Sequence, residues 1–186
     1  MRIIAGQFKG RRLWSPARSL VRPTSERVRE AVFDVLGQHV IASRVLDLFA
    51  GTGAFGFEAL SRGAAYVSFV ERNSASVQII KRNAEELGVR DRVSVRVGGA
   101  AQALNFFVGA RETFDVIFMD PPYDAKELDL VWRQPALSRV MSQNGVLVVE
   151  SRRTSSERQT PDLLSRTFAR RYGDTLVEMF RLGEEE

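Results

Sequence analysis

The chain has 186 residues, of which 44% are hydrophobic and 27% are charged, as expected of a globular domain that buries a sizeable core. It contains no cysteine and a single histidine, which excludes disulfides and thiolate metal sites and argues against a histidine-based metal site. No stretch approaches the roughly 18 apolar residues of a membrane span, and residues 1–13 lack the apolar core of a secretory signal. We therefore expect a cytoplasmic globular protein without a metal.

The net charge of +4 is unevenly distributed along the chain. Residues 1–30 hold eight basic and two acidic residues, whereas the remaining residues carry more acids than bases. A concentration of cations in one segment is expected of a surface that contacts a polyanion such as RNA, although a solvated basic tail is the alternative. The candidates for RNA contacts are Arg2, Lys9, Arg11, Arg12, Arg22 and Arg27.

The N-terminal part of the chain predicts a hairpin followed by a helix. Residues 1–4 and 11–14 read as short strands joined through Gly6 and Gly10, so residues 1–21 form a basic arm. Thr24 is the expected N-cap of a helix that stops at Gly37. The apolar stripe of this helix comprises Val28, Ala31, Val32, Val35 and Leu36. Arg22, Arg27 and Arg29 lie off that stripe, either solvated or facing a cofactor or nucleic acid.

From residue 45 onward, strands and helices alternate, which predicts a doubly wound and mostly parallel α/β sheet. The closing segment instead predicts an antiparallel hairpin that turns at Gly173-Asp174. Ser74 is the expected N-cap of the second helix in this region. The expected strands are residues 45–49, 66–71, 92–97, 114–119, 145–150, 167–172 and 175–182, and the later helices are residues 74–87, 100–108 and 127–141.

A glycine-rich loop follows the first strand of this region. Residues 51–56 (GTGAFG) fit the G-x-G-x-x-G pattern, and Glu71 ends the next strand 20 residues after Gly51. Taken alone, this pattern indicates a dinucleotide site, and hence a nicotinamide oxidoreductase or a non-catalytic nucleotide-binding module. The same geometry suits S-adenosylmethionine, whose ribose also needs an acid. Asp47 favours S-adenosylmethionine, because an acid just before the glycines attracts a cationic amino group and repels a pyrophosphate.

A second motif, Asp120-Pro121-Pro122-Tyr123, follows the fourth strand and should open on the same edge of the sheet. The two prolines fix the backbone and remove two N–H donors, which leaves carbonyl oxygens as acceptors. Such a corner suits an exocyclic NH₂ group of a nucleobase, with Tyr123 stacked on the base. An Asx-type turn covered by an aromatic ring is the structural alternative.

These two motifs, together with residues 22–30 (RPTSERVRE), make the chain resemble the RsmD family of bacterial small-subunit rRNA guanine-N2 methyltransferases over nearly its full length. The resemblance implies a Rossmann-like methyltransferase domain over residues 22–186 and S-adenosylmethionine as donor. It also implies, as acceptor, a guanine of 16S rRNA within a small-subunit particle. Nothing in the sequence demands more than a monomer.

The resemblance also assigns roles by position. Asp47, Gly51 and Gly53 would hold the methionine moiety and Glu71 the ribose, while residues 120–123 would hold the target base. Many related methyltransferases carry an acid after the third strand, but this chain reads Gly98-Gly99-Ala100-Ala101 there, so backbone groups are the candidates for adenine contacts. The candidate cofactor residues are Asp47, Ala50, Gly51, Thr52, Gly53, Glu71, Arg72, Asn73, Gly99 and Ala100. An amino-methyltransferase of adenine or cytosine, in DNA or another RNA, stays as the alternative.

Overall fold

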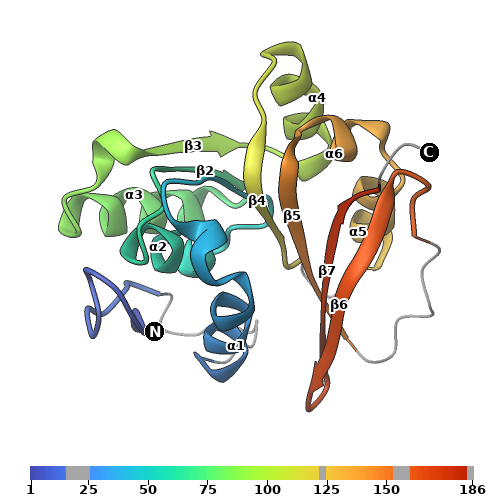
Figure 1. Ribbon diagram of the computed structural model, residues 1–186. Coiled ribbons are helices and arrows are strands. Elements are labelled where there is room, and N and C mark those ends of the chain that lie inside the picture. The colour runs from blue at the N-terminus through green and yellow to red at the C-terminus, as the bar shows by residue number, and fades with distance from the viewer. Residues whose placement is uncertain (16–25, 122–124, 153–159, 184–186) are drawn as a thin grey trace.

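The computed structural model describes residues 1–15, 26–121, 125–152 and 160–183, which form a sheet covered by helices (Figure 1). Arg22 and Thr24, and the motif residues Pro122 and Tyr123, lie outside the described residues. In the described part of the chain, no helix is long and apolar enough to cross a bilayer.

The sheet has seven strands in the order β3-β2-β1-β4-β5-β7-β6. Strands β1 to β5 are parallel, whereas β7 is antiparallel to β5 and β6 is antiparallel to β7. The doubly wound sheet and its closing hairpin are thereby confirmed. The strands are β1 (Arg44–Asp47), β2 (Tyr66–Glu71), β3 (Val93–Val97), β4 (Phe114–Met119), β5 (Met141–Arg152), β6 (Leu164–Tyr172) and β7 (Thr175–Leu182).

Helices cover both faces of the sheet because successive strand residues point to opposite sides. Val45 and Val116 join one core cluster with α1 (Glu26–Leu36), α2 (Ala54–Ser61) and α3 (Ser74–Glu86). Leu46 and Ile117 join a second cluster on the other face. That face is covered by α4 (Ala100–Gly109), α5 (Ala125–Trp132) and α6 (Pro135–Arg139), and two short 3₁₀ helices complete the list, η1 (Gly37–Val40) and η2 (Arg90–Arg92).

Several element boundaries differ from the sequence-based prediction, including the start of β6, which lies at Leu164 rather than at residue 167. The single helix expected over residues 127–141 is wrong, because Pro135 lacks an N–H group and starts a new helix at its first position. Strand β5 then begins at Met141, four residues earlier than expected. The N-cap of α3 is Asn73 rather than Ser74, since the Asn73 side-chain oxygen accepts from the backbone nitrogens of Ala75 and Ser76.

The N-terminal segment (residues 1–15) folds back on itself and packs against the domain. Arg2 and Arg12 form an antiparallel bridge, and Ile3 and Leu13 are buried in the core. Helix α1 ends at Leu36, and Gly37 adopts a φ of 50° there. The expectation that Arg29 lies off the buried stripe is wrong: its side chain is fully buried, whereas Val35 of the predicted stripe is 44% exposed.

Candidate active site

Among the described residues, the candidates for cofactor and base binding lie at the carboxyl edge of the parallel strands. Asp47 is the last residue of β1 and is in register with Phe69 of β2 and Phe118 of β4. Glu71 therefore ends the strand on one side of Asp47, and Asp120 follows the strand on the other side. Asp120 and Glu71 are close enough that their negative charges raise the pKa of Asp47. This edge is where open α/β sheets bind their ligands.

The glycine loop (residues 50–53) is built from tight backbone turns that require glycine. Gly51 and Gly53 have φ values of 54° and 83°, in the left-handed region. A side chain on Gly53 would begin 2.6 Å from the Phe57 ring. One on Gly56 would begin 2.2 Å from the Phe69 ring, so Gly56 lets α2 pack closely on β2. The loop leads into α2, and Thr52 and Gly51 are half-buried at the rim of the edge.

Asp47 is a buried acid that accepts one hydrogen bond from the residues that the structure describes. It is 3% exposed, and Oδ2 accepts from the backbone nitrogen of Gly56 at 3.2 Å. Burial raises the pKa of Asp47 to about 7, the charges of Asp120 and Glu71 add to this rise, and the Gly56 hydrogen bond opposes it. A buried carboxyl with a pKa near neutrality is poised to ionise when a cationic group binds beside it.

Glu71 ties the end of β2 to the glycine loop. Its Oε2 accepts from the Gly51 nitrogen at 2.8 Å, and Oε1 accepts from the Asn73 nitrogen at 2.7 Å. A carboxylate oxygen has two lone pairs, so each oxygen can accept one further hydrogen bond. Arg72 and Asn73 are exposed beside it. The carbonyl of Glu71 accepts from the Gly98 nitrogen at 3.1 Å, which brings the candidate adenine contacts Gly99 and Ala100, at the start of α4, to the same rim.

Asp120 and Pro121 are half-buried directly after β4. Three phenylalanine rings, from α1, α2 and β4, pack together next to this corner. The ring of Phe118 stacks on Phe55 with centroids 4.8 Å apart, and Phe33 lies 5.5 Å from Phe118. The Phe118 carbonyl accepts from the Leu48 nitrogen at 3.0 Å, which holds the ends of β1 and β4 together.

Glu58 of α2 anchors the N-terminal segment and was missed by the sequence analysis. It is fully buried, and its two oxygens accept from the backbone nitrogens of Ile4 at 2.8 Å and Ala5 at 3.0 Å. Arg62 donates to it at 2.8 Å, and Arg29 Nε lies 3.6 Å from Oε2. Burial lowers the pKa of Arg29, and the charge of Glu58 opposes that effect. The sequence signal that could have identified Glu58 is an acid within the otherwise mostly apolar run AFGFEALS (residues 54–61).

Asn83 of α3 links the same N-terminal segment to the glycine loop. Its side-chain oxygen accepts from the Trp14 nitrogen at 2.7 Å, and its amide nitrogen donates to the carbonyls of Trp14 and Thr52 at 3.2 and 3.3 Å. The side chain is 1% exposed. One buried amide thus satisfies backbone groups from two segments that are far apart in the sequence.

Replacing Asn83 by alanine should lower the free energy of unfolding by about 1–3 kcal/mol, because it leaves buried backbone groups without partners. Urea unfolding followed by circular dichroism measures this loss. The matched control is Asn105→Ala on the exposed face of α4, which should stay within about 0.5 kcal/mol of the wild type. Equal stability of the two variants would contradict this role for Asn83.

Some of the basic residues predicted to contact RNA are bonded within the protein, whereas others are exposed. Arg2 pairs with Glu26 at 3.0 Å, and Arg11 donates to the carbonyl of Glu86 at 2.8 Å. Lys9 and Arg12 are exposed on the N-terminal segment, and Arg27 is exposed on the first turn of α1.

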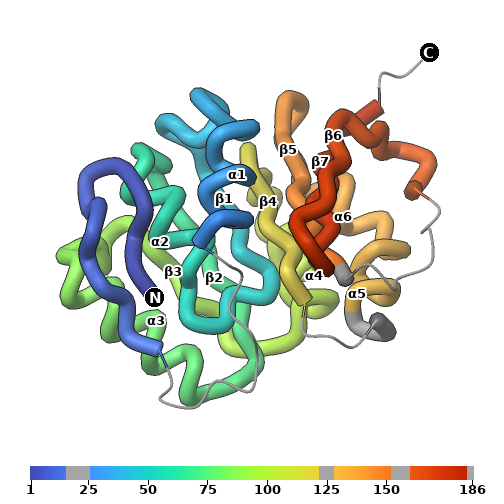
Figure 2. The backbone as a smooth tube through the Cα atoms, turned by 90° about the horizontal axis from the view of Figure 1, so that it is seen from below, coloured from blue at the N-terminus to red at the C-terminus, as the bar shows by residue number. Residues whose placement is uncertain are grey.

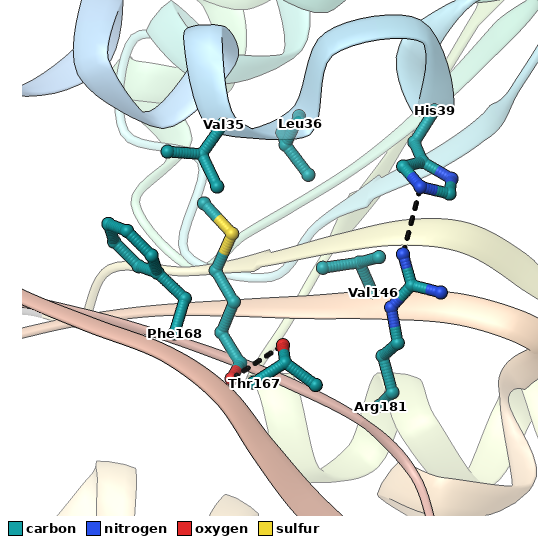
Figure 3. A pocket seen from close by; sticks show the side chains of 8 residues that line it. Val35, Leu36, His39, Val146, Thr167, Phe168 and Arg181 are labelled. Atoms are coloured by element: carbon teal, nitrogen blue, oxygen red, sulfur yellow. Dashed lines mark hydrogen bonds between the residues drawn. The ribbon is translucent and has the colours of Figure 1, made fainter.

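A hollow of about 340 Å³ lies at the other end of the strands, between α1, η1 and the closing hairpin (Figure 3). Its walls are mainly apolar, from residues such as Leu36, Val146 and Phe168. Two polar side chains of these walls already contact each other, with Arg181 Nη2 lying 2.8 Å from His39 Nε2. This hollow is separate from the edge that carries Asp47 and Asp120.

Comparison with known proteins decides the family. Residues 1–181 match the family described as "Conserved hypothetical protein 95". The chain belongs to this family. The chain is also similar to a Bacillus subtilis (strain 168) relative named "Putative rRNA methyltransferase YlbH", with 34% identity over 181 residues, 97% of this chain and 98% of the relative. The resemblance to the RsmD family is thereby confirmed.

Two further similarities come from Escherichia coli. "Ribosomal RNA small subunit methyltransferase D" of strain K12 is 37% identical over 123 residues, and the match spans 66% of this chain and 60% of the relative. The structure titled "Putative methyltransferase yhhF" is 29% identical and superimposes with a TM-score of 0.84 over 98% of this chain and 97% of its own. The fold is therefore the Rossmann-like methyltransferase fold predicted from the sequence.

Proposed function

We propose that this protein transfers a methyl group from S-adenosylmethionine to the exocyclic N2 amine of a guanine in small-subunit rRNA. The observation that carries the proposal is the meeting of Asp47, Glu71 and Asp120 at one carboxyl edge, in a chain of the family reported above. Relatives named as rRNA methyltransferases support the reaction and the class of acceptor.

The residues at this edge fit the cofactor. S-adenosylmethionine supplies the electrophilic methyl group, and its methionine end carries a cationic amino group. Asp47 is a buried acid with no cationic partner among the described residues, so it holds that amino group together with backbone groups of residues 50–53. Glu71 accepts from the ribose hydroxyls, and Arg72 and Asn73 border the ribose. Backbone groups of Gly99 and Ala100 contact the adenine.

The corner after β4 receives the target base. The Asp120 carboxylate and the Pro121 carbonyl each accept one N–H of the guanine amine, which aims the nitrogen lone pair toward the methyl group. Tyr123 stacks on the base, and Pro122 keeps the corner rigid. Alignment of the two reactants provides much of the rate, on the order of several kcal/mol. Asp120 takes up the proton that the methylated nitrogen releases.

The acceptor guanine lies in 16S rRNA within a small-subunit particle, and the enzyme acts as a monomer in the cytoplasm. The basic arm over residues 1–21 contacts the RNA through the exposed Lys9 and Arg12, and Arg27 of α1 adds a further exposed cation. Residues 22–186 form the methyltransferase domain.

The test is methylation of small-subunit particles isolated from cells that lack the enzyme, followed by mass spectrometry of the rRNA nucleosides. The expected product is N2-methylguanosine, formed only with S-adenosylmethionine. Detection of methylated adenosine or cytidine instead would show that the acceptor is an adenine or cytosine amine rather than a guanine. Tight binding of NADH without binding of S-adenosylmethionine would overturn the proposal.

The affinity for S-adenosylmethionine should depend on pH through Asp47. Only the ionised carboxylate attracts the amino group, and the pKa of Asp47 lies at about 7. Affinity should therefore rise about tenfold per pH unit between pH 5 and pH 6 and level off near pH 7. Isothermal titration calorimetry at several pH values measures this dependence. Asp47→Asn should bind more weakly at pH 7 and lose the dependence. A wild-type affinity that is constant from pH 5 to pH 7 would contradict the role of Asp47.

A further inference from the structure

The closing hairpin brings a second group of cations to the edge that carries Asp120. Met119 of β4 is in register with Val149 of β5, while Arg152 of β5 is in register with Thr175 of β7. Tyr172 of β6 in turn pairs with Thr175. The hairpin tip (residues 170–174) therefore reaches beyond the carboxyl ends of the parallel strands, as Figure 1 shows.

The hairpin tip lies against the first turn of α1 and encloses a hollow of about 350 Å³. Its walls comprise Arg27, Val28, Arg170, Arg171, Tyr172 and Gly173. The three arginines are exposed, and none of them has an ion-pair partner within the described residues. The Arg170 guanidinium lies 5.4 Å from the centroid of the half-buried Tyr172 ring. Asp174 in the turn is the acid adjacent to this group in the sequence.

An alternative role for Arg170 and Arg171 is protection of the sheet edge, because β6 is an edge strand. Charged side chains on an edge strand hinder pairing with another chain. Arg166 of the same strand serves such a structural role, since it forms a cross-strand ion pair with Glu178 at 2.9 Å. Arg170 and Arg171 have no such pair in the described structure, and they gather with Arg27 from a different element. Three like charges held together repel one another, so the arrangement favours an anionic ligand.

We propose that the hollow formed by Arg27, Arg170, Arg171 and Tyr172 binds the sugar–phosphate backbone of the rRNA strand that carries the target base. The inference rests on the function proposed above and extends it with a contact surface on the hairpin. Strand β6 lies three strands from β4, or about 14 Å across the sheet. One RNA strand can therefore have its target base at Asp120 and its flanking phosphates at the hairpin.

The chemistry of the hollow suits a nucleic-acid strand. Guanidinium groups bind phosphate through paired N–H donors. Viewed onto this edge, the N-terminal segment and the hairpin flank the end of β4 (Figure 2). The RNA would thus be held on both sides of the reacting base.

The experiment compares the double variant Arg170→Gln/Arg171→Gln with the control Arg166→Gln in the full-length protein. The probe is the small-subunit particle from cells that lack the enzyme. We expect the double variant to bind this particle about tenfold more weakly at moderate salt, with the slope of log affinity against log salt reduced by about 1 to 2. Its KM for the particle should rise while kcat and the affinity for S-adenosylmethionine stay unchanged. Arg166→Gln should match the wild type in all these readouts.

The outcomes separate this inference from the proposed function. Wild-type methylation with an unchanged salt slope and KM in the double variant would overturn the role of the hairpin and leave the methyltransferase intact. Absence of methylation by the wild type would overturn the proposed function. In that case the salt dependence of particle binding would still test the hairpin surface. A reduced slope in the double variant would support the surface, and an unchanged slope would overturn it. Equal losses in the double variant and in Arg166→Gln would assign the effect to the strand edge in general.

Discussion

Replacing Asp120 by alanine is expected to lower kcat by about 10²-fold or more while S-adenosylmethionine still binds. In the proposed mechanism, Asp120 orients the guanine amine and accepts its proton, contributions that are typically worth 10²–10⁴-fold. In the same mechanism, the cofactor contacts Asp47, Glu71 and the glycine loop instead. Removal of Asp120 also removes a charge that raises the pKa of Asp47, so cofactor affinity below pH 7 should increase slightly rather than fall.

Replacing Glu71 by alanine is expected to have the opposite effect, with a loss of cofactor affinity rather than of the chemical rate. This change removes a carboxylate that accepts from Gly51 and Asn73 and is proposed to bind the ribose. Cofactor affinity should fall by about 10- to 100-fold, since hydrogen bonds to charged groups are worth about 1.5–3 kcal/mol. Calorimetry gives the affinities, and single-turnover methylation of particles at saturating cofactor gives the chemical rate. An equal loss of cofactor affinity in both variants would contradict this division of roles.

Local motifs predicted where Asp47, Glu71 and Asp120 lie in the fold because the parts of this edge are defined by short stretches of backbone. The strand at residues 66–71, the glycines that follow the first strand and the acid at the end of the second strand are each specified by neighbouring residues. Alternation of strands and helices then places all carboxyl ends on one edge. The meeting of Asp47, Glu71 and Asp120 follows from these two facts without knowledge of side-chain contacts.

Long-range pairing was not predictable in the same way. Arg29 lies among polar neighbours in the sequence, but its guanidinium is buried because Glu58, far away in the chain, supplies a counter-charge. Counting charges by segment assigned the whole positive excess to residues 1–30. That average concealed Arg170 and Arg171, which the register of an antiparallel hairpin carries to the same edge as Asp120.

Replacing Glu58 by glutamine is expected to lower the free energy of unfolding by about 3–5 kcal/mol, the cost of breaking a buried ion pair from one side. Glutamine keeps one acceptor oxygen, but its NH₂ group would face the donors of Arg29, Arg62, Ile4 or Ala5. For a chain of this length, that loss corresponds to a fall in Tm of about 10 °C. Urea unfolding and calorimetry measure both quantities.

The matched control is Glu112→Gln, which breaks the exposed pair with Arg44 at 2.8 Å and should cost no more than about 1 kcal/mol. A loss of less than 1 kcal/mol in Glu58→Gln would contradict the role of Glu58. Glu58 has two roles, as the counter-charge of Arg29 and as the acceptor for the Ile4 and Ala5 nitrogens. The double variant Arg29→Met/Glu58→Gln separates these roles, because it leaves no buried Arg29 charge without a counter-charge. Stability should partly recover in this variant.

The anchor for Ile4 and Ala5 should stay weakened in the same double variant, because their nitrogens bond to different oxygens of Glu58 and glutamine places an NH₂ donor where one of these oxygens was. Hydrogen exchange of residues 1–15 should therefore be faster than in the wild type even where global stability is regained. Faster exchange confined to this segment would establish that Glu58 fixes the basic arm to α2, the helix that begins at the glycine loop. The arm proposed to contact RNA and the loop proposed to hold the cofactor would then be positioned by one buried carboxylate.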